Sequence, residues 1–363
     1  MGIADIVRKS EQLMNKVGTK RSAEAGWKPS ITGYYGYGDE GMIRVLARVL
    51  MRDPDEERMD NEATANSSLS TKAQRGFRQF FTIQVGGHPV TVRAGNAVVE
   101  AHSNENGYVE VQVKDHGLEP GWQKVTIEAQ DAEPVEAEVF IIEPGTKIGL
   151  VSDIDDTIMV TWLPRALLAA YNSWVLRTNA RKPVPGMSSF YAELLKRHPN
   201  APVFYLSTGA WNTYDSLVDF IGKHLLPKGP MLLTDWGPTP TGLFRSGQEH
   251  KKVQLRNLII DFPNIKWILV GDDGQHDPLI YGNIAAEHPD RIAGIGIRQL
   301  TPGEHVLSHG SAIPIDDPET TGHAEAPYVL GKDGFELLKE YLKNPFPRER
   351  KLADVEDAQG VNG

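Results

Sequence analysis

The 363-residue chain contains no cysteine. Disulfide bonds and thiolate-bound metals are therefore excluded, and a metal ion would need oxygen or imidazole ligands, which favours a hard cation. Positive charge is also scarce, because 38 Lys and Arg residues stand against 48 Asp and Glu residues, a formal net charge of -10. Binding to nucleic acid and general attraction to anionic membranes both depend on an excess of basic side chains. The balance therefore argues against a nucleic-acid partner.

The first residues lack a long apolar run. A secretory signal has an apolar core of roughly 7 to 15 residues, and its absence here predicts a cytoplasmic protein. Apolar residues recur at helical spacing within residues 1–25, so this segment is expected to form an amphipathic helix. Two roles stay open for it. It can pack on its own protein, or it can place basic residues such as Arg8 and Lys16 on a membrane surface as a peripheral contact.

Residues 26–145 carry the pattern of a small all-β domain with a sandwich-like fold. Alternating or β-branched segments are separated by the turn signals GG, GN, NENG and EPGW. The polar residues 53–71 are expected to form a loop inside this domain. The sequence does not identify a protein partner of the domain. The expected strands are Met42–Leu50, Gln79–Val85, Val90–Ala94, Tyr108–Val113, Gln123–Ala129 and Val135–Ile142.

A glycine pattern within this region needs separate treatment. The segment GYGDEG, residues 36–41, matches the dinucleotide-binding pattern G-x-G-x-x-G. The preceding WKPSITGYY, residues 27–35, lacks the apolar character of the buried strand that such a site requires. The match is therefore interpreted as a glycine-rich turn.

From residue 146 the pattern changes to alternating strands and helices. This alternation predicts an α/β fold, a doubly wound parallel sheet with right-handed crossovers, over residues 146–345. Residues 346–363 are charged and contain glycine, which predicts a disordered tail. The expected strands are Lys147–Ser152, Pro202–Ser207, Met231–Thr234, Trp267–Val270 and Ile292–Ile297.

The most informative motif directly follows the first of these strands. In SDIDDTI, Asp153 and Asp155 form a D-x-D-x-T pattern with Thr157, for which a supporting role is expected. Two carboxylates at this spacing suit phosphoryl transfer, because one can attack phosphorus while the other donates a proton to the leaving group. Asp156 is expected to cap a following helix.

Residues that follow parallel strands converge on one edge of the sheet. Several carboxylates on such an edge repel one another unless a cation neutralises them, and all-oxygen ligands favour Mg²⁺. A phosphoryl group there would also need a lysine, a hydroxyl and backbone N–H groups to stabilise its charge. The residues expected at this edge are Asp153, Asp155, Ser207, Thr208, Lys251, Asp272, Asp273 and Asp277.

These motifs, in this order, resemble the haloacid dehalogenase superfamily: a D-x-D-x-T at Asp153, a serine at Ser207, a lysine at Lys251 and an acidic strand ending at Asp272. A narrower resemblance over residues 147–300 is to the catalytic domain of the actin-patch-associated phosphatidate phosphatase family. SDIDDTI, FYLST, LLTDWG, EHK and GDDGQHDPLIY carry it. The segment STGAWN after the second strand departs from the family pattern, which leaves the shape of the phosphate pocket open.

The resemblance implies roles for the matched residues. Asp153 would be the nucleophile that forms an aspartyl-phosphate, and Asp155 would be the general acid and base. Mg²⁺ would be held by Asp153, the backbone carbonyl of Asp155 and Asp272. The phosphate would be bound by Ser207, Thr208 and Lys251, while Asp273 or Asp277 would orient Lys251 or a metal-bound water.

The implied activity is Mg²⁺-dependent hydrolysis of phosphatidate. A phosphatase for a soluble phosphate ester, a phosphotransferase, and a scaffold protein with a vestigial catalytic domain remain as alternatives. The apolar stretch of residues 158–174 also has two interpretations. It can form an apolar wall that receives acyl chains or touches lipid, or it can be a helix packed on its own protein.

Overall fold

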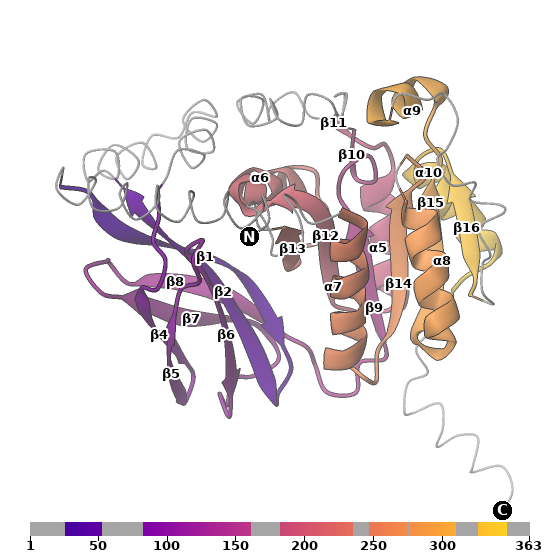
Figure 1. The fold of residues 1–363 in the computed structure, drawn as a ribbon. Coiled ribbons are helices and arrows are strands. Elements are labelled where there is room, and N and C mark those ends of the chain that lie inside the picture. Colours follow the sequence, from indigo (N-terminus) through magenta and orange to yellow (C-terminus); the bar gives the residue numbers. More distant parts are fainter. Residues whose placement is uncertain are drawn as a thin grey trace, which may run out of the picture.

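The computed structural model describes residues 26–52, 83–160, 182–234, 247–274, 276–309 and 326–346. Two groups of strands lie side by side in the molecule (Figure 1). The predicted helix at residues 1–25, the predicted loop at 53–71 and nearly all of the stretch 158–174 and of the tail lie outside the described residues. Within the described ranges, no helix is both long enough and apolar enough to cross a bilayer.

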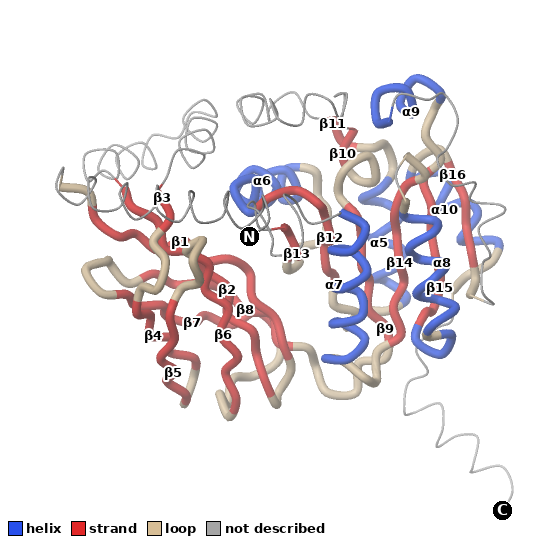
Figure 2. Tube along the Cα trace, viewed as in Figure 1, coloured by secondary structure: helices blue, strands red, loops and turns tan. Residues whose placement is uncertain are grey.

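The first group is a curled, eight-stranded sheet, drawn in red at the left of Figure 2, to which every described strand before residue 142 belongs. Its order is β3-β2-β1-β8-β7-β4-β5, with β6 paired to β2. Neighbouring strands run antiparallel except for the parallel pair β1 and β8. The strands are β1 (Lys28–Gly38), β2 (Met42–Arg52), β3 (Ile83–Gln84), β4 (Pro89–Ala94), β5 (Ala97–His102), β6 (Tyr108–Lys114), β7 (Gly121–Ala129) and β8 (Val135–Ile141).

Alternation explains why these segments form strands. In β6 the side chains of Val109, Val111 and Val113 are buried and those between them are exposed, as expected when successive residues point to opposite faces. The predicted strands at β2, β4, β6, β7 and β8 are confirmed. The strand β5 was not predicted.

Strand β1 corrects the glycine-rich turn. The segment WKPSITGYY is mostly β-strand, and this strand continues through Gly36 to Gly38. A Cβ atom at Gly36 would overlap the carbonyl oxygen of Arg44 on β2, so the close approach of the two strands requires glycine there. Only the residues around Asp39 form the turn, and its carboxylate accepts bonds from the N–H groups of Gly41 and Met42.

The second group is a six-stranded sheet in which all neighbouring strands are parallel. Its order is β13-β12-β9-β14-β15-β16, so the chain winds outward from β9 on one side and then from β14 on the other. This confirms the predicted parallel sheet, while β16 was not predicted. The strands are β9 (Ile148–Asp153), β12 (Val203–Ala210), β13 (Met231–Thr234), β14 (Lys266–Asp272), β15 (Ile292–Arg298) and β16 (Tyr328–Gly331).

Helices cover both faces of the parallel sheet. In Figure 1, α7 (Gly247–Asp261) and α8 (Asp277–Glu287) lie in front of it, and α5 (Met187–Arg197) and α10 (Gly334–Lys343) lie behind it. The remaining described helices are α6 (Tyr214–Lys223) and α9 (Pro302–His309), with short 3₁₀ turns η4 (Trp211–Thr213) and η5 (Pro289–Arg291). With both faces covered, the strands are buried along their length, as in β9 and β15.

Two short segments lie at the borders of this unit. The first described residues of the stretch 158–174 form the short strand β10 (Met159–Val160), which pairs antiparallel with β11 (Lys182–Pro183), and the two interpretations of this stretch stay predictions. Phe346, expected to open the tail, is buried with its ring centroid 5.1 Å from that of Tyr341. Hydrophobic burial therefore extends the folded unit by one residue.

Candidate active site

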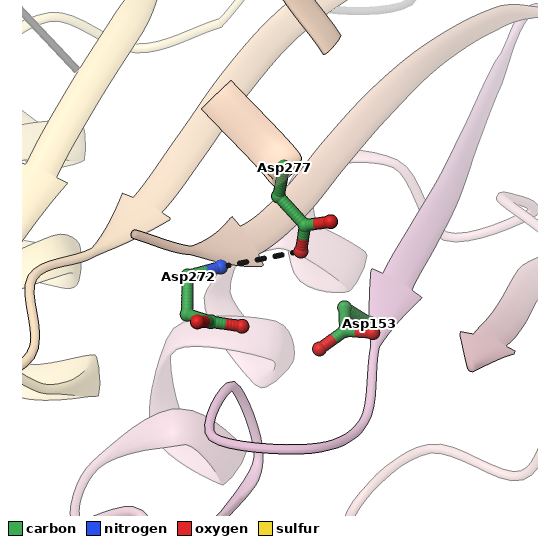
Figure 3. Close-up of side chains that lie close together, drawn as sticks. All are labelled: Asp153, Asp272 and Asp277. Carbon is green, nitrogen blue, oxygen red and sulfur yellow. Dashed lines mark hydrogen bonds between the residues drawn. The ribbon is translucent and has the colours of Figure 1, made fainter. Parts of the chain in front are cut away.

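Three buried aspartates meet where the strand order of the parallel sheet changes direction. Asp153 ends β9, Asp272 ends β14, and Asp277 begins α8. One carboxylate oxygen from each lies within 4.8 Å of the others, and none of the three residues is more than 2% exposed. Figure 3 shows the three side chains facing one another. The crevice beside such a switch point is the usual ligand site of an open α/β sheet.

Lys251 is the positive group of this cluster. It lies in the first turns of α7, is 2% exposed, and places Nζ 2.7 Å from Asp153 Oδ1 and 2.6 Å from Asp277 Oδ1. The sequence left open whether Asp273 or Asp277 contacts this lysine. The structure places Asp277 there, whereas Asp273 Oδ1 accepts a 2.8 Å bond from the N–H of Leu300.

Thr157 forms hydrogen bonds with the aspartates that end β9 and β14. Its Oγ1 lies 3.0 Å from Asp153 Oδ2 and 3.2 Å from Asp272 Oδ2. The intervening loop turns back tightly because Asp156 adopts a left-handed backbone conformation with φ 57°. The expectation that Asp156 caps a helix is wrong, since its N–H donates to the Met159 carbonyl oxygen and a strand follows.

Asp155 lies on the more open side of the site. It is partly exposed, unlike Asp153, and its Oδ2 accepts a 3.0 Å hydrogen bond from the Ser207 hydroxyl. The Gly209 N–H donates to the same hydroxyl oxygen at 2.9 Å. The predicted pair of acids and the predicted serine are therefore brought together. Thr208 follows Ser207 and is partly exposed.

The pKa values in the cluster are set by the burial of its side chains and by the short distances between their charges. Burial, reinforced by the neighbouring Asp277 carboxylate, raises the pKa of both Asp153 and Asp272. Burial alone would lower the pKa of Lys251, but the surrounding aspartates outweigh it and the net pKa is raised. Three carboxylates thus face one ammonium group. The residual negative charge and the all-oxygen donor set fit a hard divalent cation.

Two residues that support the loop after β9 were not predicted from the sequence. Arg298, at the end of β15, donates to the Asp156 carbonyl oxygen at 2.7 Å and to Glu304 Oε1 at 2.6 Å. Glu304 and Thr301 form reciprocal bonds at the start of α9, and the pattern T-x-x-E is a recognisable helix-start signal. No local signal shows that Arg298 reaches the loop after β9, because that contact crosses from another strand.

Gly271 sets the space available to Asp277. A Cβ atom at this position would overlap Asp277 Oδ2 and lie 2.8 Å from the Tyr281 ring. We expect Gly271→Ala to displace Asp277 from Lys251 and to lower the free energy of unfolding by about 1 to 3 kcal/mol, the usual cost of overpacking. Urea denaturation measures this change.

The matched control is Gly222→Ala in α6, where an added Cβ meets nothing within 4 Å. Because alanine is the better helix former, this variant should be unchanged or more stable by up to about 1 kcal/mol. Equal stability of the two variants would contradict the steric account of Gly271.

The fold and the site together define an α/β domain with a buried aspartate and lysine cluster at the switch point of a parallel sheet. Residues 148–299 match the family model described as the catalytic domain of phosphatidate phosphatase APP1. The narrower resemblance seen in the sequence is thereby confirmed.

Two yeast proteins are similar over the same part of the chain. Phosphatidate phosphatase APP1 of Saccharomyces cerevisiae is 32% identical over 154 residues, which are 42% of this chain and 26% of that protein. An uncharacterized protein of Schizosaccharomyces pombe is 26% identical over 154 residues, 42% of this chain and 25% of that protein. The match therefore spans only about a quarter of the length of these relatives.

Among solved structures, a carbohydrate acetylesterase from Xanthomonas citri aligns with 72% of this chain and 65% of its own, at 8% sequence identity and a TM-score of 0.26. A likeness this weak carries no argument about fold or function.

Proposed function

We propose that the chain is a Mg²⁺-dependent phosphoric monoester hydrolase that acts on phosphatidate through an aspartyl-phosphate intermediate. One observation carries the proposal: the buried cluster of Asp153, Lys251, Asp272 and Asp277 lies within a segment that matches the phosphatidate phosphatase catalytic domain. The strand order with β9 at the centre supports a haloacid dehalogenase-like fold. We also propose that residues 26–145 and 146–345 form two domains.

The nucleophile in this proposal is Asp153. Its carboxylate attacks phosphorus, so that a new bond forms between phosphorus and the aspartate oxygen while the bond to the substrate alkoxide breaks. Asp155 gives its proton to the departing alkoxide, which is a poor leaving group without it. Such proton transfer is typically worth about 10²- to 10⁴-fold in rate.

The second half-reaction uses the same two residues. Asp155, now a carboxylate, takes a proton from a water molecule that attacks the aspartyl-phosphate, which frees phosphate and regenerates Asp153. Its greater exposure and its position beside Ser207 suit a group that must meet both leaving group and water. A phosphotransferase would instead use Asp155 to take the proton of an acceptor hydroxyl, so the release of free phosphate distinguishes hydrolysis from transfer.

Phosphoryl oxygens would be held by the groups around the nucleophile. Ser207, Thr208 and the ammonium group of Lys251 are the proposed donors, and Asp277 keeps Lys251 oriented. Thr157 orients the Asp153 carboxylate. Asp153, Asp272 and the Asp155 carbonyl would hold Mg²⁺, which when bound offsets the repulsion between the carboxylate nucleophile and the anionic phosphate.

The test is a phosphate-release assay on the purified full chain, with phosphatidate micelles and a soluble aryl phosphate as substrates. We expect release from phosphatidate with Mg²⁺ and none when EDTA replaces it. Hydrolysis of the soluble ester alone would contradict the lipid substrate and leave the phosphatase in place. If neither substrate released phosphate, the result would favour the alternative of a scaffold protein with a vestigial catalytic domain. Phosphate release in EDTA would contradict the metal requirement. The cytoplasmic location and a peripheral membrane contact remain predictions.

A further inference from the structure

The segment that carries Ser207 and Thr208 touches the other sheet. Just past the end of β12, Trp211 stacks on Tyr34 of β1, with ring centroids 4.5 Å apart and an interplanar angle of 28°. Both side chains are buried, at 8% and 5% exposure. The end of the proposed phosphate-binding segment is therefore packed against a strand far away in the sequence.

A second contact strengthens this joint. Tyr214, at the start of α6, places its hydroxyl 2.7 Å from the Tyr35 backbone nitrogen, which donates to it. A register shift in β1 between Tyr34 and Tyr37 interrupts the pairing with β2 at that point, so the Tyr35 N–H is available to leave the strand ladder. The Tyr214 ring also meets Tyr34 edge-on at 4.8 Å.

The segment between Leu206 and Ala210 departs from regular pairing with β13. Leu206 pairs with Leu232 and Ala210 with Thr234, so the intervening residues of β12 bulge opposite Leu233. Thr234 Oγ1 donates to the Thr208 and Gly209 carbonyl oxygens at 2.9 and 3.2 Å. The bulge is thus anchored by Thr234 on one side and by the aromatic joint beyond Ala210 on the other.

We propose that the eight-stranded sheet positions the phosphate-binding segment through this joint. Tyr34 and Trp211, aided by Tyr214, are positioning residues: they do not touch phosphate, and they set where Ser207 and Thr208 lie relative to Asp153. The inference rests on the proposed function and gives the eight-stranded sheet a role in it. A displacement of about 1 Å at a reacting centre can cost on the order of 10²-fold in rate, so packing precision here affects turnover.

A contact between the eight-stranded sheet and helix α7 offers a matched control. Arg44 of β2 makes a two-pronged ion pair with Asp261, with Nε 3.1 Å from Oδ2 and NH2 3.0 Å from Oδ1. Asp261 is the last residue of α7, and the rise of about 1.5 Å per residue puts it roughly 15 Å along the helix from Lys251. Losing this ion pair removes a contact between the eight-stranded sheet and α7 and leaves the aromatic joint and the bulge in β12 in place.

The experiment compares Tyr34→Leu, Tyr34→Phe and Arg44→Met in the full chain. The readouts are kcat and KM for a soluble aryl phosphate, the inhibition constant of inorganic phosphate, and the melting temperature. We expect Tyr34→Leu to lower kcat/KM by roughly tenfold, the scale of a sub-ångström displacement of the reacting groups, and to raise the inhibition constant because Ser207 and Thr208 shift with the segment. Tyr34→Phe, which keeps the stacked ring, should restore most of the affinity. Arg44→Met should lower the melting temperature while the inhibition constant stays within about twofold, since its contact is remote from the bulge.

The outcomes separate the inference from the proposed function. If Tyr34→Leu melts earlier but keeps the wild-type inhibition constant, the positioning role is wrong and the phosphatase stands. An equal rise of the inhibition constant in Arg44→Met would also overturn the positioning role, because the loss of a remote contact would then have the same effect as the loss of the aromatic joint. Should Tyr34→Leu fail to fold, Tyr214→Phe removes only the hydroxyl that anchors Tyr35 and must raise the inhibition constant severalfold. A wild-type chain without phosphatase activity overturns both proposals.

Discussion

Asp153→Asn is expected to abolish phosphate release. An amide cannot attack phosphorus, so the covalent route is lost, and removal of a nucleophile costs at least about 10⁴-fold in kcat. The fold should survive, because asparagine keeps the shape of the side chain and Lys251 keeps its 2.6 Å contact with Asp277. Steady-state phosphate release and circular dichroism of the same preparation measure the two effects.

Asp115→Asn serves as the control for this substitution. Asp115 is exposed, lies in the eight-stranded sheet region, and has φ 54°, a conformation that asparagine tolerates well. This variant should keep full activity and stability. A residual rate for Asp153→Asn above about 1% of wild type would be too large for a lost nucleophile and would contradict the aspartyl-phosphate route.

Lys251→Met is expected to have the largest effect on stability. Lys251 supplies the ammonium group that faces the buried Asp153 and Asp277 carboxylates, and removing one partner of a buried ion pair costs about 3 to 5 kcal/mol. Urea denaturation at neutral pH in EDTA measures the loss. Activity should disappear as well, because the proposed donor to the phosphoryl group is gone.

The loss should depend on pH in a defined direction. Burial already raises the pKa of Asp153, and Lys251 is the group that opposes this rise. In the variant the folded state therefore binds more protons than the unfolded chain at neutral pH, so its stability increases as the pH falls toward the ordinary aspartate pKa of about 4. Stability that stays flat over this range would contradict the crowding of charge at the site.

Lys252→Met is the matched control, one residue further along α7. Its ammonium group pairs at 3.5 Å with the exposed Glu249, a type of contact worth about 0 to 1 kcal/mol. This variant should change the free energy of unfolding by less than about 1 kcal/mol and keep its activity. A larger effect at Lys252 than at Lys251 would mean that the lysine of the motif was assigned one position too early.

Local patterns predicted much of the fold, because strand periodicity is a local property. The apolar run before Asp153 and the run before Asp272 became β9 and β14 with nearly the expected limits. The prediction failed at β1, because the glycines of residues 36–41 suggested a turn and residues 27–35 lack the apolar character of a buried strand. That segment is a strand because it pairs with its neighbour β2 and because the Trp211 ring of η4 stacks on its Tyr34.

The sequence by itself determined the chemical composition of the site. The strand ends and their acids, the lysine, the serine and the absence of cysteine are all readable along the chain, since parallel strands must deliver such residues to one edge. Only the tertiary structure decided which of them touch. It placed Asp277 rather than Asp273 on Lys251, brought Arg298 to the loop after Asp153, and packed Tyr34 on Trp211. These pairs are far apart in sequence, and their contacts depend on crossovers and side-chain directions that no local pattern encodes.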